Sequence, residues 1–120
     1  MEIIENYIDG KLVAPNSNQY IDNFCPSTGE VYAKIPNSDI DDVQKAVESA
    51  KNAFPIWKNL SIEKRSSYLY KIADEIENQF DQFAHAETKD NGKPFKLSKH
   101  VDIPRAIANF RFYAGAVLHF

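Results

Sequence analysis

ETKDNGKP at residues 87–94, VDIPRA at 101–106 and NFRFYAG at 109–115 follow one another in the second half of this chain. Asn91 and Gly92 tolerate a left-handed backbone, so this pair predicts the end of the preceding helix. Pro94 has a fixed φ that suits the first turn of the helix that follows. The first segment therefore predicts a helix end, a loop and a new helix.

Pro104 divides the part of the chain that comes next. It removes a backbone donor, so we expect a kink or a helix start near Asp102. Beyond the loop, apolar residues recur at close to the helical period, at Val101, Ile107, Phe110, Ala114 and Val117. This pattern predicts that a helix forms the end of the chain.

Upstream of this region the sequence predicts three further helices. Ser38 is a candidate N-cap for the first helix, three aspartates follow it in the first turn, and Pro55 is expected to stop it before a connector that holds Trp57. Ser61 caps the second helix, and Asn78-Gln79 marks a break before a shorter third helix from about Phe80 to Thr88. One apolar face of the first helix consists of Ile40, Val43, Val47, Ala50 and Phe54.

Two β-hairpins are predicted ahead of the helices. NYIDGKLVA, from Asn6 to Ala14, places apolar residues on both sides of Asp9-Gly10, a dipeptide that favours a tight primed turn. The segments Gln19–Phe24 and Val31–Ile35 read as two more strands that are joined by a turn. Strands first and helices after indicate an α+β arrangement if the chain stands alone.

Composition limits the class of protein. The chain has 120 residues, a net charge of −3 and 43% hydrophobic residues, which is typical of a globular domain or part of one. No basic excess points to nucleic acid, and no apolar run approaches a membrane span. The lone cysteine cannot form an internal disulfide, and the N-terminus lacks a secretory signal pattern, so we expect a cytoplasmic protein.

Catalytic motifs are scarce. The sequence contains no G-x-G-x-x-G, no phosphate loop and no G-x-S-x-G. His85, His100 and His119 are too dispersed to indicate a metal site. Cys25 is best read as a small apolar residue. The sequence pattern by itself therefore assigns neither a catalytic residue nor a cofactor contact.

The sequence resembles the N-terminal part of NAD(P)-dependent aldehyde dehydrogenases. The resemblance lies in ETKDNGKP, in FRFYAG about twenty residues later, and in YIDGKLV and PSTGEV upstream. DIPRAIANFRF resembles the branch that oxidises 2-hydroxymuconate or 2-aminomuconate semialdehydes. The resemblance implies an α/β aldehyde dehydrogenase fold, with residues 1–120 as two β-hairpins and helices of the Rossmann-like cofactor-binding domain and no internal domain boundary. It also implies a full-length homo-dimer or homo-tetramer. The family's catalytic cysteine, general base and dinucleotide contacts would lie beyond residue 120, so we expect an inactive segment of a longer enzyme.

The resemblance implies a site for a potassium or sodium ion. The aspartate of the ETLDNGK motif, Asp90 here, would bind the cation together with the backbone carbonyls of Asn23 and Phe24. Carbonyl and carboxylate oxygens suit a hard cation. The alternative is that Asp90 only caps a turn through its side chain.

Arg105 occupies a position that faces the substrate entrance in the family, and muconate-type semialdehydes carry a carboxylate remote from the aldehyde. The planar guanidinium fork could bind that carboxylate through two parallel hydrogen bonds. The alternative is a surface arginine paired with Asp102. Arg111 matches the arginine of the family's RYYAG motif and is expected to tie the structure together.

A different class of function stays open at this stage. A chain of this kind could also be a non-catalytic module whose exposed helical faces bind a partner. A natural protein several times heavier than 13.7 kDa would favour the enzyme, and a stable 13.7 kDa product would favour the module.

Overall fold

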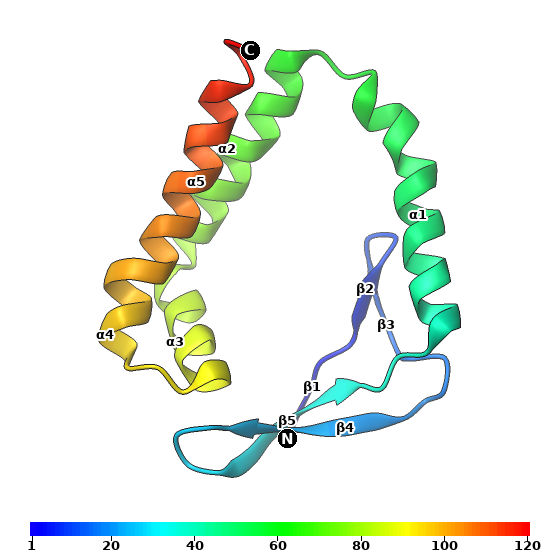
Figure 1. Cartoon of the computed structure of the whole chain (residues 1–120), viewed down its shortest axis with the longest axis vertical. Helices are drawn as coiled ribbons and strands as arrows, with labels where there is room; N and C mark the ends of the chain where they lie inside the picture. The colour runs from blue at the N-terminus through cyan, green and yellow to red at the C-terminus, as the bar shows by residue number, and fades with distance from the viewer. The chain divides into compact units, whose positions relative to one another are not determined.

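The computed structural model describes residues 1–120 as two compact units, Met1–Lys58 and Asn59–Phe120 (Figure 1). The first unit holds all five strands and helix α1, and the second holds helices α2 to α5 with a short π-helix. Strands come first and helices after, as the sequence predicts.

The first predicted hairpin is confirmed. Strands β2 (Asn6–Ile8) and β3 (Lys11–Val13) pair antiparallel across a two-residue turn. Asp9 and Gly10 have φ angles of 53° and 75°, the left-handed values that a primed turn requires.

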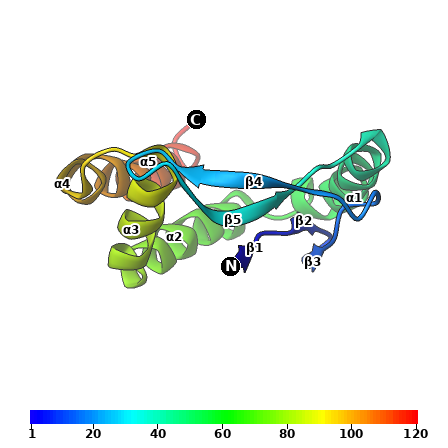
Figure 2. The ribbon, with the colours of Figure 1, turned by 90° about the horizontal axis from the view of Figure 1, so that it is seen from below.

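The second hairpin is confirmed as well, and it belongs to a three-stranded sheet (Figure 2). Strand β4 (Tyr20–Cys25) runs antiparallel to β5 (Glu30–Pro36), with an irregularity between Asn23 and Phe24. Strand β1 (Glu2–Ile3) adds to the other edge of β5 in parallel. The sequence did not reveal β1, because two residues are too few to show an alternating pattern.

Helix α1 (Ile40–Lys58) begins with a reciprocal cap. The Asp39 carboxylate accepts hydrogen bonds from the backbone N–H groups of Asp41 and Asp42, at 2.9 and 3.2 Å, and Asp42 accepts one from the Asp39 N–H at 3.0 Å. Asp42, itself buried, also accepts from the Asn16 N–H at 2.9 Å. This cap fixes the entry of α1 against the loop that precedes β4.

Two predictions for α1 are wrong. Ser38 does not cap the helix; its hydroxyl donates to the Asn6 side chain at 3.0 Å, and Asp39 takes the capping position. Pro55 does not stop the helix, which continues through Trp57 to Lys58. A proline removes only its own bond to the carbonyl four residues earlier, and the residues after it can still donate to theirs.

In the second unit, α2 (Ile62–Asn78) and α5 (Ile103–Ala116) lie side by side (Figure 1). Ser61 caps α2 as predicted, accepting from the Lys64 N–H at 3.2 Å. Ser66 is buried on α2 and donates its hydroxyl proton to the Ala114 carbonyl at 2.7 Å. This bond joins the two helices at their closely packed, small-residue contact.

The connection between α2 and α5 is itself helical. Helix α3 (Phe80–Asn91) follows a break at Gln79, and α4 (Phe95–Leu97) leads into a π-helix at Ser98–Asp102. Gly92 ends α3 with a φ of 76°, as predicted. The core of this unit combines residues of α2, α3 and α5: Ala73, Ala84, Ile103 and Ile107, with Ile76, Phe80, Phe95 and Phe110 packed against them.

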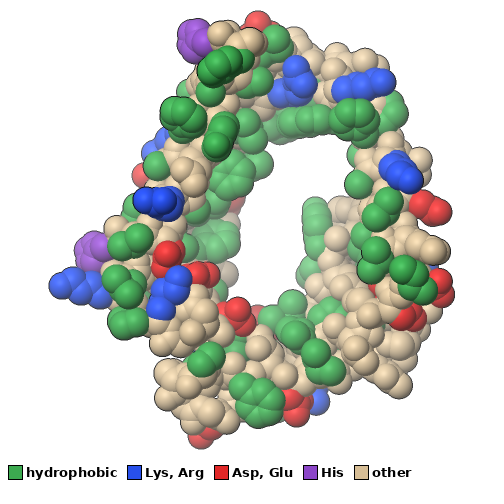
Figure 3. Space-filling model, in the orientation of Figure 1, with side chains coloured by type: hydrophobic (Ala, Val, Ile, Leu, Met, Phe, Trp, Pro, Cys, Tyr) green, Lys and Arg blue, Asp and Glu red, His purple; other side chains and the backbone are tan.

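Much of the apolar surface stays uncovered (Figure 3). The predicted apolar face of α1 is exposed, with Ile40 at 67% and Phe54 at 58%. In the second unit Phe112 is 68% exposed and lines a shallow apolar groove together with Leu69, Tyr113, Ala116, Val117 and Phe120. No helix here has both the length and the apolar character that a membrane crossing needs.

Candidate functional site

The π-helix at Ser98–Asp102 interrupts the helical run just before α5. It closes with a hydrogen bond from the Ile103 N–H to the Ser98 carbonyl, five residues apart. The Ser98 side chain is fully buried, and its hydroxyl shares a 2.8 Å hydrogen bond with the Thr88 hydroxyl of α3. Since π-turns are rare and occur frequently at functional sites, this one marks the start of α5 as a candidate site.

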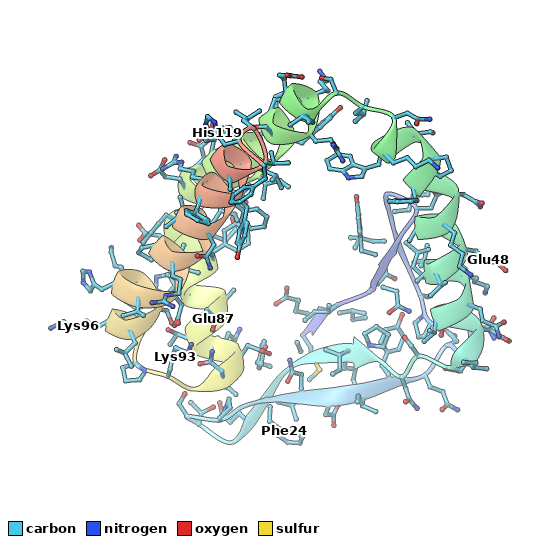
Figure 4. All side chains as sticks on the ribbon, turned by 45° about the horizontal axis from the view of Figure 1, so that its top comes forward. Phe24, Glu48, Glu87, Lys93, Lys96 and His119 are labelled. Carbon is cyan, nitrogen blue, oxygen red and sulfur yellow. The ribbon has the colours of Figure 1, made fainter.

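Lys93, in the loop after α3, links α3 to the last residue of the π-turn. Its ammonium group lies 2.9 Å from Glu87 Oε1 on α3 and 2.7 Å from Asp102 Oδ2 at the end of the π-turn. Figure 4 labels Lys93 and Glu87 near the end of α3. Asp102 first, and then Glu87, raise the pKa of Lys93 because both carboxylates favour its charged form.

Arg105 lies in the first turn of α5 with an exposed side chain. The predicted alternative, an ion pair with Asp102, is not what forms: Asp102 is paired with Lys93, and no ion pair of the structure includes Arg105. An exposed guanidinium leaves five donors in a planar fork, which is the geometry that binds a carboxylate. The role of Arg105 in substrate binding stays a prediction.

Arg111 has the structural role that was expected of it. On α5 it donates to Glu77 at 2.6 Å and to Asp74 at 3.0 Å, both on α2. Glu77 first, and then Asp74, raise the pKa of Arg111 above its already high ordinary value. The guanidinium therefore forms a second link between α5 and α2, more than two helical turns along α2 from Ser66, and is committed to that contact.

The predicted cation ligands fall on both units. Asn23 and Phe24 belong to β4, at the irregularity where the regular pairing with β5 is interrupted. The Asn23 side chain donates to the Tyr32 hydroxyl at 3.0 Å. The pairing passes from Asn23–Ala33 to Phe24–Val31, so the extra residue of this irregularity is Tyr32 of β5.

Asp90 is exposed in the last turn of α3. Beside it, Asn91 Oδ1 accepts a hydrogen bond from the Lys93 N–H at 2.9 Å. Carbonyl and carboxylate oxygens are the type of donor that a monovalent hard cation takes. The cation site stays a prediction.

The remaining polar candidates have ordinary surroundings. His85 stacks on Phe95 with a ring distance of 4.2 Å, and no group of three or more His, Cys, Asp or Glu side chains is placed to hold a metal ion. Cys25 is buried beside Ser27, whose hydroxyl lies 3.1 Å from its sulfur. Gly10 and Gly29 lie in hairpin turns and Gly92 at a helix end, each with a positive φ.

Sequence reasoning missed Lys93 and Ser98. Lys93 belongs to the ETKDNGKP motif, and acidic residues stand on both sides of it in the sequence, at Glu87 and Asp102. That charge pattern is the signal that could have found it. Ser98 gave no signal, because its burial depends on how α3 packs against the π-turn.

The comparisons with known proteins agree with this geometry. Residues 12–120 match the model of the aldehyde dehydrogenase family. The chain is 47% identical over 117 residues to 2-aminomuconic semialdehyde dehydrogenase of Homo sapiens and 50% identical to that of Danio rerio. In both cases 98% of this chain is aligned, and it spans 24% of the relative's length.

Solved structures show the same likeness. An indole-3-acetaldehyde dehydrogenase in complex with NAD+ matches with a TM-score of 0.94 and 32% identity, over 98% of this chain and 24% of that one. PnpE in complex with nicotinamide adenine dinucleotide matches with a TM-score of 0.91 and 36% identity, over 93% and 23%. With both sequence and fold in agreement along nearly its whole length, the chain belongs to the aldehyde dehydrogenase family, and it has the fold of the N-terminal part of these enzymes.

Proposed function

We propose that this chain is the N-terminal segment of an NAD(P)-dependent oxidoreductase that oxidises a carboxylated semialdehyde to the acid. The observation that carries the proposal is the identity of 45–50% to four 2-aminomuconic semialdehyde dehydrogenases across 98% of the chain. An Acinetobacter long-chain-aldehyde dehydrogenase is 42% identical over 94% of the chain. The chain is thus more similar to the semialdehyde dehydrogenases than to this long-chain-aldehyde dehydrogenase, which favours a substrate that carries a carboxylate.

Within that enzyme, the residues of this segment would bind and orient the substrate. Arg105, exposed at the start of α5, would hold the remote carboxylate of the substrate through a bidentate contact. Such a contact fixes one end of the substrate and so limits the positions of its aldehyde. No residue of this segment is proposed as a nucleophile or general base.

The dinucleotide, when bound, supplies the hydride acceptor. We propose that its cradle is formed by other residues of the enzyme; in support, no helix of this chain starts from a glycine-rich turn. Two of the solved relatives are complexes with the dinucleotide, which supports its use by the proposed enzyme. In that enzyme we propose that Asn23, Phe24 and Asp90 hold a potassium or sodium ion.

Three further expectations from the family resemblance remain proposals. Residues 1–120 would form part of one cofactor-binding domain, the enzyme would be a homo-dimer or homo-tetramer, and it would be cytoplasmic. The exposed apolar residues of α1 and α5 support the first two, because large uncovered apolar surfaces mark places where other protein packs.

The same exposed residues are what an interaction module would need, so the two functions require a decisive comparison. A native protein several times heavier than 13.7 kDa, with NAD-dependent aldehyde oxidation, supports the enzyme. A stable natural product of 13.7 kDa without activity would support the module.

Substrate choice is tested by Arg105→Ala in the full-length enzyme. Loss of the carboxylate contact should cost about 2–4 kcal/mol in kcat/KM for a carboxylated semialdehyde and little for a neutral aldehyde of similar length. Lys96→Ala, an exposed cation on α4, is the matched control and should leave both substrates unchanged. Equal losses in kcat/KM for both substrates, or no loss for either, would show that Arg105 does not bind the substrate carboxylate.

A further inference from the structure

The connection from α3 to α5 is pinned at both ends of its π-turn. Ser98, the first residue of the turn, is hydrogen-bonded to Thr88 of α3, and Asp102, the last, is paired with Lys93. Lys93 is in turn paired with Glu87 of α3. The π-turn thus has a buried hydroxyl contact on one side and a two-carboxylate ion pair on the other.

The location of these contacts decides what they can influence. Asp102 stands directly before Ile103, where α5 begins. Arg105 lies three residues after Asp102. A π-turn inserts one residue into the helical register, so it sets the direction in which the first turn of α5 presents its side chains. Ile103, packed in the core, holds the opposite side of that turn.

A surface ion pair would contribute little here, but this one differs in geometry. Lys93 bridges two carboxylates within 2.9 Å, and its side chain is only 28% exposed. The Lys99–Asp81 pair on the same π-turn is more exposed, at 42% and 70%, and does not touch Asp102. Networks with such close geometry hold structure where isolated exposed pairs do not.

We propose that Lys93 is a positioning residue for substrate specificity: through Asp102 it fixes the π-turn and thereby aims Arg105 at the carboxylate of the semialdehyde. This rests on the proposed function. Lys93 itself touches neither substrate nor cofactor, and its effect passes through the helix start.

The test uses the full-length enzyme with Lys93→Met, which keeps length and removes charge. KM for a carboxylated semialdehyde should rise roughly tenfold, since small misplacements of a binding group weaken it strongly. For a neutral aldehyde kcat/KM should stay within about twofold, and Lys93→Arg should restore most of the loss. Lys99→Met, which removes the exposed pair on the same turn, is the control that should behave as wild type.

A double-mutant cycle separates positioning from general stabilisation. In an Arg105→Ala background Lys93→Met should have almost no further effect on the carboxylated substrate, because its target is gone. Additive losses, or equal losses for both aldehydes, would overturn the role of Lys93. If Lys93→Met does not fold, Asp102→Ala removes the acceptor of the same contact and is judged by the same outcomes.

The two proposals fail in distinguishable ways. A selective loss in Arg105→Ala without any selective loss in Lys93→Met overturns the positioning role alone. The absence of a selective loss in Arg105→Ala overturns the carboxylate contact itself, and the positioning role falls with it.

Discussion

Three cationic side chains of the second unit are used in different ways. Arg111 is committed to Glu77 and Asp74, and Lys93 to Glu87 and Asp102, so their charges are satisfied inside the protein. Arg105 takes part in none of these pairs and is exposed. An arginine that the fold does not use is available to a ligand, and this difference among neighbours is the structural support for its role.

The cation site makes a prediction at single residues. If Asp90 binds potassium or sodium with the carbonyls of Asn23 and Phe24, Asp90→Ala should abolish any potassium dependence of the Tm of the full-length enzyme. Ligand binding to the folded state raises Tm with ligand concentration, and loss of the carboxylate removes that linkage. Glu48→Ala, which removes an exposed carboxylate from α1, should keep it. Identical melting of wild type and Asp90→Ala across potassium and sodium series would show that the site is wrong.

The role of a residue could be predicted only where a family motif or the chemistry of a single residue type indicated it. Arg111 was expected to tie the structure together, but its partners on α2 depend on packing between segments far apart in sequence. The pairing of Asp102 with Lys93 rather than Arg105 was missed for a related reason. Spacing rules assume a regular α-helix, and the π-turn changes which side chains share a face.

At the scale of elements, local chemistry was a good guide to boundaries. Asp9-Gly10, Ser61 and Gly92 each act where their backbone or capping preferences placed them. Ser38 failed as a cap because Asp39 can form a reciprocal cap with Asp42, which a serine one residue earlier cannot. The prediction that α1 ends at Pro55 was wrong because the proline removes only one hydrogen bond of the helix.

The end of α3 offers a stability test. Gly92 has a φ of 76°, so Gly92→Ala should lower the free energy of unfolding by about 1–2 kcal/mol through left-handed strain. Gly115→Ala is the matched control: it lies within α5, where an added Cβ would meet the Tyr70 hydroxyl at an ordinary 3.5 Å. That substitution should be neutral or stabilising by up to about 1 kcal/mol, given the helix propensity of alanine. Urea denaturation of both variants checks this, and equal effects would contradict it.

The cap of α1 predicts a pH dependence. The Asn16 side chain first, and then the backbone N–H of Asp42, lower the pKa of Asp39 by hydrogen-bonding its charged form. Since the folded pKa lies below the unfolded value of about 3.9, the stabilisation is present above that pH and is lost as pH falls through the folded pKa.

The variant Asp39→Asn can still accept hydrogen bonds but does not titrate, so its stability should fall less between about pH 5 and pH 2. Asn16→Ala, which removes the main cause of the shift, should also flatten the profile. Thermal melting across this pH range measures both effects. Parallel profiles for wild type and Asp39→Asn would contradict the assignment.

At the scale of the whole chain, the order of motifs predicted the family and the fold, since each hairpin and helix occurs in the family's order. Patterns within the chain could not show what covers the apolar faces. Ile40 and Phe54 repeat at helical spacing as core residues do, yet they are exposed here. A hydrophobic face shows that something is buried against a helix, but it does not identify the partner.

The last prediction follows from the glycine positions and concerns the chain of 120 residues by itself. It should bind no dinucleotide and oxidise no aldehyde, because Gly10, Gly29 and Gly92 serve turns and a helix end, and Gly115 lies within α5, so none of the four opens a helix as a phosphate cradle does. Isothermal titration with NAD should give no heat above dilution, while the full-length enzyme under the same conditions should bind. Retained helical circular dichroism and a cooperative melt of the 120-residue chain are needed to show that a missing signal does not come from an unfolded sample. Binding at micromolar affinity, about −8 kcal/mol, would place cofactor contacts among residues 1–120 and would overturn the division of labour that is proposed for this segment.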